Sequence, residues 1–202
     1  MSLYGLIIGI AFVLCSEILF RQTNIIKHKN IFLFGLLISS IIGARLYHVI
    51  EQWSYYSNNF SQIPNTRGGG LSILGAILAG LLFTFLYSKF NKINFLNLLD
   101  KITLVLPLGQ GIGRFGNYVN HENPIWWPEA IMDFTLFFIL MKFPKNTTAK
   151  YLIGYGLIRF VTEFWRSDTW VINSLKIGQI ISFLFVITGL FLFWINYSKK
   201  QD

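Results

Sequence analysis

Long apolar runs recur along the whole chain and are separated by short polar stretches. A helix that crosses a membrane needs about 20 mostly apolar residues. Runs of about this length predict membrane-spanning helices over residues 3–20, 31–50, 71–90, 102–118, 129–143, 151–165 and 177–194. The fifth and sixth runs are weaker because charged residues interrupt them, Glu129 and Asp133 in one and Arg159 and Glu163 in the other. The pattern predicts an all-α, polytopic membrane protein with about seven transmembrane helices in a single domain, residues 1–202.

Composition agrees with this interpretation and removes one alternative. Hydrophobic residues make up 53% of the chain and charged residues only 13%, whereas soluble domains have about 25% charged residues. The net charge of +8 would suit a nucleic-acid-binding protein, but the basic residues are dispersed over several loops and form no patch. The N-terminus lacks the basic segment and the cleavage site of a secretory signal, so we expect a retained first helix.

The distribution of basic residues predicts an orientation. Lysines and arginines concentrate after the first, third, fifth and seventh apolar runs, for example Lys27, Lys92, Lys145 and Lys199. The opposite side carries Arg67, Arg166 and Lys176. Because basic residues favour the cytoplasmic side of a membrane, the N-terminus is predicted to lie outside and the C-terminus in the cytoplasm.

One polar stretch interrupts this apolar background at the end of the fourth run. Glycines occupy alternate positions from Gly109 to Gly113, and such residues let backbones approach closely. The stretch then presents, within nine residues, five polar side chains: Arg114, Asn117, Asn120, His121 and Glu122. A charge at membrane depth costs a few kcal/mol or more unless it is paired or hydrated. The grouping predicts a functional site, with a structural ion pair between Arg114 and Glu122 or another acid as the alternative.

Three arginines converge toward the outer leaflet in the predicted orientation, namely Arg45, Arg114 and Arg159. Arginine keeps its charge in any environment and its planar fork of donors suits phosphate, so an anionic phospholipid headgroup is a candidate ligand. Tyr155 lies one helical turn before Arg159, on the same face. Two alternatives stay open, since Arg159 could be neutralised by Glu163 four residues later and Arg45 could extend to the interface.

The polar stretch resembles the signature of the bacterial prolipoprotein diacylglyceryl transferases. The match is best from Asp100 through Pro107, Gly109, Gly113, Arg114, Gly116, Asn117 and Asn120 to Glu122. Further similarity covers almost the whole chain: Gly43-x-Arg45-Leu46, Gly69-Gly70-Leu71-Ser72, Tyr155-Gly156-x2-Arg159-x3-Glu163-Phe164-x-Arg166, and Gly178-Gln179-Ile180.

The resemblance implies seven spans and a definite reaction. Members of the family transfer a diacylglyceryl group from phosphatidylglycerol to the lipobox cysteine of a prolipoprotein, and glycerol phosphate leaves. It implies catalytic roles for Arg114, Arg159, Glu122 and Tyr155. It implies substrate binding by Arg114, Asn117, Asn120, Arg45, Gly69, Gly70 and Ser72. The expected partners are phosphatidylglycerol or another anionic phospholipid and the prolipoprotein signal peptide, and the expected location is the bacterial cytoplasmic (inner) membrane.

Two positions depart from the family pattern. Leu74 stands where the family has a histidine that could activate the thiol, and Trp127 stands where it has a second histidine. His48, His121 and Glu122 are therefore the candidate bases. The alternatives are a non-catalytic lipid-binding or lipid-moving protein, or a related transferase with another acceptor. No cofactor is expected, and the three scattered histidines and the single cysteine offer no metal-ligand spacing.

Overall fold

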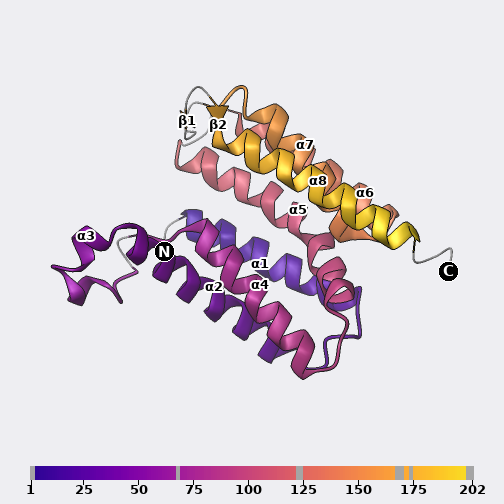
Figure 1. Cartoon of the computed structure of the whole chain (residues 1–202), viewed down its shortest axis with the longest axis horizontal. Coiled ribbons are helices and arrows are strands. Elements are labelled where there is room, and N and C mark those ends of the chain that lie inside the picture. The colour runs from indigo at the N-terminus through magenta and orange to yellow at the C-terminus, as the bar shows by residue number, and fades with distance from the viewer. Residues whose placement is uncertain (1–2, 67–68, 122–124, 167–170, 173–174, 199–202) are drawn as a thin grey trace. The chain divides into compact units, whose positions relative to one another are not determined.

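The computed structural model describes residues 3–66, 69–121, 125–166, 171–172 and 175–198, and most of these residues are helical (Figure 1). The elements are α1 (Leu3–Arg21), α2 (Lys29–Glu51), α3 (Trp53–Tyr56), the 3-10 helix η1 (Phe60–Gln62), α4 (Ile73–Phe90), α5 (Phe95–Val119), α6 (Trp126–Lys142), α7 (Thr147–Thr162), β1 (Val171–Ile172), β2 (Leu175–Lys176) and α8 (Ile177–Ser198). The two short strands pair antiparallel, Val171 with Lys176.

The helical class predicted from the apolar runs is confirmed. A long helix lies in each of the seven predicted ranges, although α4 begins two residues late, α6 ends one residue early and α7 ends three residues early. Among the described residues, four helices are apolar and long enough to cross a membrane by length and composition, α1, α2, α4 and α8. Large apolar side chains such as Ile38, Leu82 and Phe183 are exposed along them, as expected where lipid is the solvent. The count of seven spans and the orientation stay predictions.

The chain forms two compact units, one of Met1–Thr23 and Leu99–Asp202 and the other of Asn24–Leu98. Each is described by itself, and the prediction of a single domain stays a prediction. In the second unit α2 packs along α4. Their closest approach lies at Gly43 and Gly75, where a Cβ on either residue would clash with the backbone carbonyl of the other. Small residues permit this close crossing of apolar helices.

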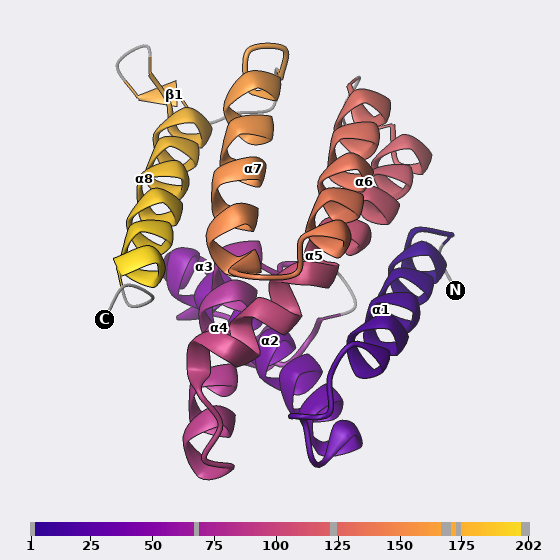
Figure 2. The same cartoon turned by 90° about the vertical axis from the view of Figure 1, so that its right-hand side faces the viewer.

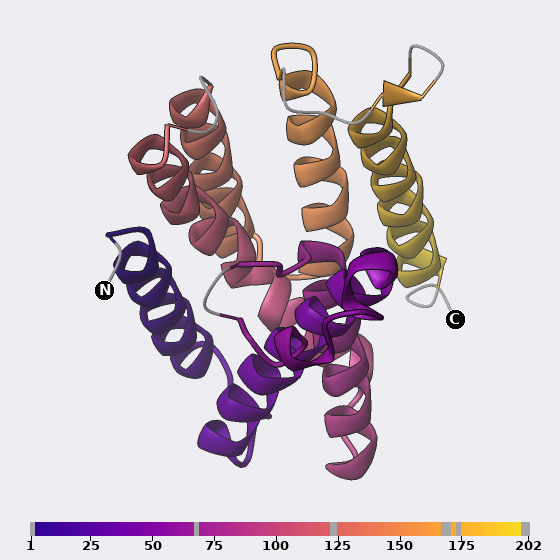
Figure 3. The same ribbon diagram turned by 90° about the vertical axis from the view of Figure 1, so that its left-hand side faces the viewer.

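The first unit is built on the helices that follow Leu98. Helix α7 lies beside α8 in all three views (Figures 1, 2 and 3) and also packs against α6. A buried apolar cluster of Leu136, Leu140 and Tyr151 joins α6 to α7. The start of α7 is held by α5, because the Asp100 carboxylate accepts from the Thr148 backbone N–H at 2.8 Å. This contact satisfies one of the free N–H groups of the first turn.

Candidate functional site

Glycines in the second half of α5 bring neighbouring elements close to its backbone. A Cβ at Gly111 would lie 2.8 Å from the ring of Phe134 on α6, and one at Gly116 would lie 2.7 Å from the ring of Tyr4 on α1. Only glycine lets these aromatic rings approach the helix so closely. The close approach of α6 places its acidic residues within reach of Arg114.

Arg114 pairs with two buried carboxylates of α6. Its Nη1 lies 3.0 Å from Glu129 Oε2, and its Nε lies 3.4 Å from Asp133 Oδ2. Glu129 and Asp133 are four residues apart and therefore share one helix face, and both are fully buried. The sequence left open an ion pair between Arg114 and an acid other than Glu122, and the structure contains such pairs. These pairs also explain why α6 tolerates two acids in an apolar helix.

Glu129 also binds the arginines of the α7 end. Its Oε1 lies 3.7 Å from Arg159 Nη1 and 3.3 Å from Arg166 Nη1. Arg159 pairs in addition with Glu163, at 3.0 Å between Nη2 and Oε2. We call this set the ion-pair cluster: Arg114, Arg159, Arg166, Glu129, Asp133 and Glu163. Three guanidinium groups balance three carboxylates, with Glu129 at the junction.

The two charge types differ in exposure. The carboxylate side chains of the cluster are at most 1% exposed, whereas the side chains of Arg114, Arg159 and Arg166 are 14%, 24% and 11% exposed. Arginine carries five N–H donors, and these contacts use only some of them. The cluster therefore has a carboxylate side that fixes the guanidinium groups and an accessible cationic side on which an anion can bind.

The cluster continues along the inner face of α7. The rings of Tyr151 and Tyr155 stack with centroids 5.5 Å apart, one turn apart on the face that carries Arg159. Gln110 Nε2 donates to the Tyr151 hydroxyl at 2.8 Å. Gln110 Oε1 and Asp133 Oδ1 are buried and have no hydrogen-bond partner among the described residues. Buried acceptors of this kind are usually satisfied by water or a ligand.

The end of α7 is fixed by the segment that leads into α8. Lys176 Nζ donates to the Glu163 carbonyl at 2.6 Å and to the Arg166 carbonyl at 2.9 Å. The Glu163 carboxylate packs directly on Gly178, in the first turn of α8, where the partial positive charge of a helix N-terminus favours an anion. Glu163 thus has a defined position from which to orient Arg159.

The remaining candidates of this unit lie after Arg114. Asn117 is half-buried on α5 and Asn120 is exposed just beyond it. His121 is exposed and adopts a left-handed backbone conformation, with φ of 54°. Glu122 lies outside the described residues. The roles predicted for these four residues stay predictions.

The other predicted ligands gather in the second unit. The Arg45 guanidinium is buried and donates to four backbone carbonyls, those of Gln62, Ile63, Gly69 and Gly70, at 2.6–3.1 Å. It is therefore buried in the fold rather than extended to an interface. His48 lies beside Gly70, since a Cβ there would be 2.8 Å from its ring. The Ser72 N–H donates to the Ala44 carbonyl. A substrate-binding role for these residues stays a prediction.

Sequence reasoning missed the two acids of α6. Glu129 and Asp133 looked like interruptions of a weak span, while the structure makes them the main partners of Arg114. The signal was their spacing, because two acids four residues apart in an apolar helix require basic partners. Gln110 and Arg166 were also missed as members of the site. Within the described residues, no group of three or more His, Cys, Asp or Glu side chains could hold a metal ion.

Comparison with known proteins points to one family. The profile of the family described as prolipoprotein diacylglyceryl transferase matches residues 1–126 and 123–195. The phosphatidylglycerol–prolipoprotein diacylglyceryl transferase of Clostridioides difficile (strain 630) is 33% identical over 98% of this chain and 91% of its own length. Proteins of the same name from Finegoldia magna and Clostridium novyi are 33% and 31% identical, each over 98% of this chain and over 91% and 93% of their own lengths.

Proposed function

The chain belongs to the prolipoprotein diacylglyceryl transferase family, and we propose that it transfers a diacylglyceryl group from phosphatidylglycerol to the lipobox cysteine of a prolipoprotein. One observation carries the proposal. Arg114 and Arg159 share the buried carboxylate of Glu129 and keep part of each side chain accessible. Two guanidinium groups fixed from one side in this way suit a phosphate bound on the other.

In the proposed reaction the cysteine sulfur attacks the glyceryl carbon that carries the phosphate ester. A C–S bond forms as the C–O bond breaks, the electron pair leaves on the phosphate oxygen, and glycerol phosphate is released. The thiol proton passes to a base. The phosphodiester becomes a monoester, so one negative charge develops on the leaving group. Arg114 and Arg159 stabilise this charge, and preorganised donors make that stabilisation strong.

The headgroup is assigned to the polar residues around the two arginines. Asn117, Asn120 and Glu122 hold the glycerol of phosphatidylglycerol, and Tyr155 lines the pocket beside Arg159. The unpartnered acceptors Asp133 Oδ1 and Gln110 Oε1 suit the glycerol hydroxyls, which are donors. A hydroxyl-bearing headgroup satisfies buried acceptors that a choline headgroup would leave unpaired.

The base is assigned among the histidines. His121 follows α5 close to the arginine site in sequence, and His48 lies beside Gly70 in the second unit. Leu74 cannot take a proton. If His121 is the base, His121→Ala lowers the transfer rate at neutral pH, while His48→Ala leaves it unchanged. If only His48→Ala has this effect, His48 is the residue that accepts the thiol proton. A free thiol retains some thiolate without any base, so residual activity is expected in either variant.

The proposed location is the bacterial cytoplasmic membrane, with all seven long helices crossing it and the N-terminus outside. The supporting observation is the concentration of lysines after alternate helices. Cys15 is the single cysteine, so a Cys15→Ser background allows single-cysteine labelling. An impermeant thiol reagent on intact spheroplasts is expected to label Ser61→Cys and not Lys145→Cys. Labelling of the second variant contradicts the orientation.

Transfer itself is tested with purified protein in phosphatidylglycerol bilayers and a lipobox peptide. The expected result is a diacylglyceryl mass increment on the peptide with release of glycerol phosphate. Arg114→Ala and Arg159→Ala are expected to lower the rate about 10²–10³-fold, the usual effect of removing one donor that stabilises developing charge. The matched control is Arg21→Ala, whose side chain is 77% exposed and which is expected to keep full activity.

Three outcomes contradict this assignment. Full turnover by Arg114→Ala would remove the arginine pair from the mechanism. Glycerol phosphate release without peptide modification would point to a different acceptor. Lipid binding without either product would favour a non-catalytic lipid-binding protein, the alternative that the replacement of a family histidine by Leu74 supports.

A further inference from the structure

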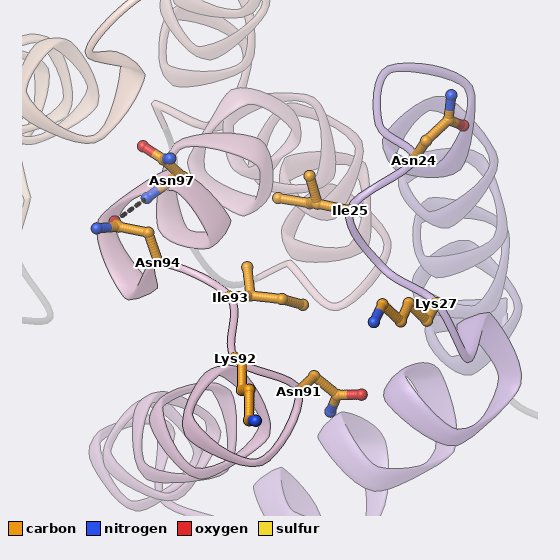
Figure 4. Close-up of a pocket in the computed structure, with 8 residues that line it drawn as sticks. All are labelled: Asn24, Ile25, Lys27, Asn91, Lys92, Ile93, Asn94 and Asn97. Carbon is orange, nitrogen blue, oxygen red and sulfur yellow. Dashed lines mark hydrogen bonds between the residues drawn. The ribbon is translucent and has the colours of Figure 1, made fainter.

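A cavity of about 410 Å³ lies in the second unit, between two chain connections. The connection from α1 to α2 contributes Asn24, Ile25 and Lys27, and the segment from α4 into α5 contributes Asn91, Lys92, Ile93, Asn94 and Asn97 (Figure 4). The volume lies within the range of about 300–1,000 Å³ typical of small-molecule sites. None of these residues belongs to the arginine site described above.

The side chains that line the cavity favour an anionic ligand. Two of its eight residues are lysines and four are asparagines, and no acidic residue is among them. In Figure 4 the Lys27 side chain reaches from one connection toward the other, while Ile25 and Ile93 point into the space between the connections. Ammonium and amide groups together supply many hydrogen-bond donors, and the two isoleucines add apolar surface to the lining.

The surrounding charge strengthens this preference. Lys27, Lys29, Lys89 and Lys92 are all at this end of the unit. Asp100, three residues after Asn97, accepts from the Thr148 N–H, and the only acid between Asn24 and Leu98 is Glu51. Glu51 ends α2, which begins at Lys29, so a helix of that length separates the acid from the cavity by about 33 Å. That distance exceeds the Debye length of about 8 Å at physiological ionic strength.

The lining residues are held by local structure. Lys92 follows the end of α4 with φ of 55°, and the Ile93 N–H donates to the Ser88 carbonyl at 2.8 Å, which closes a Schellman-type helix end. Asn94 Oδ1 accepts from the Asn97 N–H at 3.1 Å (Figure 4) and so caps the start of α5. The cavity therefore joins exposed lysine side chains to the positive end of a 25-residue helix.

We propose that this cavity is a second anion site, which binds a phosphate group through Lys27, Lys92 and the surrounding asparagine amides. The phosphate is carried either by the headgroup of an anionic phospholipid or by a soluble phosphate. The distribution of lysines predicts that this end of the unit faces the cytoplasm. Basic pockets among helices at cytoplasmic membrane faces suit anionic headgroups.

The test measures how fast Lys27 and Lys92 are acylated by a water-soluble amine reagent, with Lys89 as the internal reference. Lys89 is exposed at the same end of the unit but does not line the cavity. We expect selective slowing at Lys27 and Lys92, at least threefold, in one of two conditions. Slowing in nanodiscs with phosphatidylglycerol, relative to phosphatidylcholine alone, identifies a lipid headgroup. Slowing by inorganic phosphate in detergent without anionic lipid identifies a soluble phosphate.

Substitution checks the same site independently. Lys92→Gln is expected to weaken the protecting ligand about fivefold and Lys27→Gln with Lys92→Gln about 25-fold, as about 1 kcal/mol for each lysine gives. Lys89→Gln, which removes the same charge, is expected to change affinity less than twofold. The double variant should keep transfer activity, which shows that it folds. Equal protection of all three lysines, or none in either condition, overturns the proposal.

Discussion

Glu129 is the residue whose substitution tests the ion-pair cluster most directly. Glu129→Gln keeps the shape of the side chain and removes its charge. Three guanidinium contacts, at 3.0, 3.3 and 3.7 Å, then lose their carboxylate. The new amide N–H group is itself a donor, and it faces the guanidinium N–H groups, which cannot accept its hydrogen bond. The cluster changes from three positive and three negative groups to a net charge of +1 at a position that is fully buried.

The expected loss of stability follows from these contacts. Removing one partner from a buried ion pair costs about 3–5 kcal/mol. Water reaches the arginine side chains, which are 11–24% exposed, and Arg114 and Arg159 each keep one other carboxylate. Both effects reduce the loss, so we expect a value near the lower limit, about 3 kcal/mol. The transfer rate should fall about 10²-fold, because the two arginines of the proposed phosphate site lose a common support.

The measurement combines unfolding by sodium dodecyl sulfate titration in mixed micelles with the peptide transfer assay. Glu17→Gln is the matched control, since Glu17 also pairs with an arginine but its side chain is 58% exposed, and surface pairs contribute little. Glu129→Asp keeps the charge on a shorter side chain and should recover part of the stability with less of the activity. If Glu129→Gln and Glu17→Gln behave alike in both measurements, the reasoning is refuted.

Two other substitutions test how neighbouring contacts support the fold and the site. Gly178→Ala pushes the Glu163 carboxylate aside. It should lower transfer about 10–100-fold and cost about 1–3 kcal/mol of stability. Its control is Gly9→Ala, where the added Cβ meets nothing within 4 Å. Arg45→Gln removes charged donors from four backbone carbonyls and should cost at least about 2 kcal/mol, measured by the same titration; an unchanged unfolding midpoint would contradict this.

Helix positions followed from the sequence because lipid imposes a simple rule. A chain in hydrocarbon must satisfy its backbone internally, so each long apolar run becomes a helix. The runs at residues 3–20 and 177–194 therefore match α1 and α8 closely. The predicted helix boundaries were wrong where a helix continues through polar residues. Helix α5 begins at Phe95, not 102, because its first turns carry Asn97 and Asp100, and the latter holds the start of α7.

Elements too short to produce an apolar period were not predicted. Helix α3, η1 and the two-residue strands contain at most four residues each. Individual contacts help to decide their conformation, such as the donation of the Arg45 guanidinium to the Gln62 carbonyl of η1. A periodicity argument needs several repeats of a pattern, and these segments offer none.

The sequence by itself identified the basic residues of the proposed phosphate site. Arg114 and Arg159 stand out because a charge within an apolar run is costly unless it is paired or functional. The pairing of Glu163 with Arg159 was suggested by their spacing of four residues. Only the tertiary structure decided that Glu129 joins both arginines and that Asp133 supports one of them. The physical reason is that the energy of an ion pair depends on distance and burial. For residues on different helices, packing sets both quantities, and here Gly111 of α5 lets the Phe134 ring of α6 approach closely.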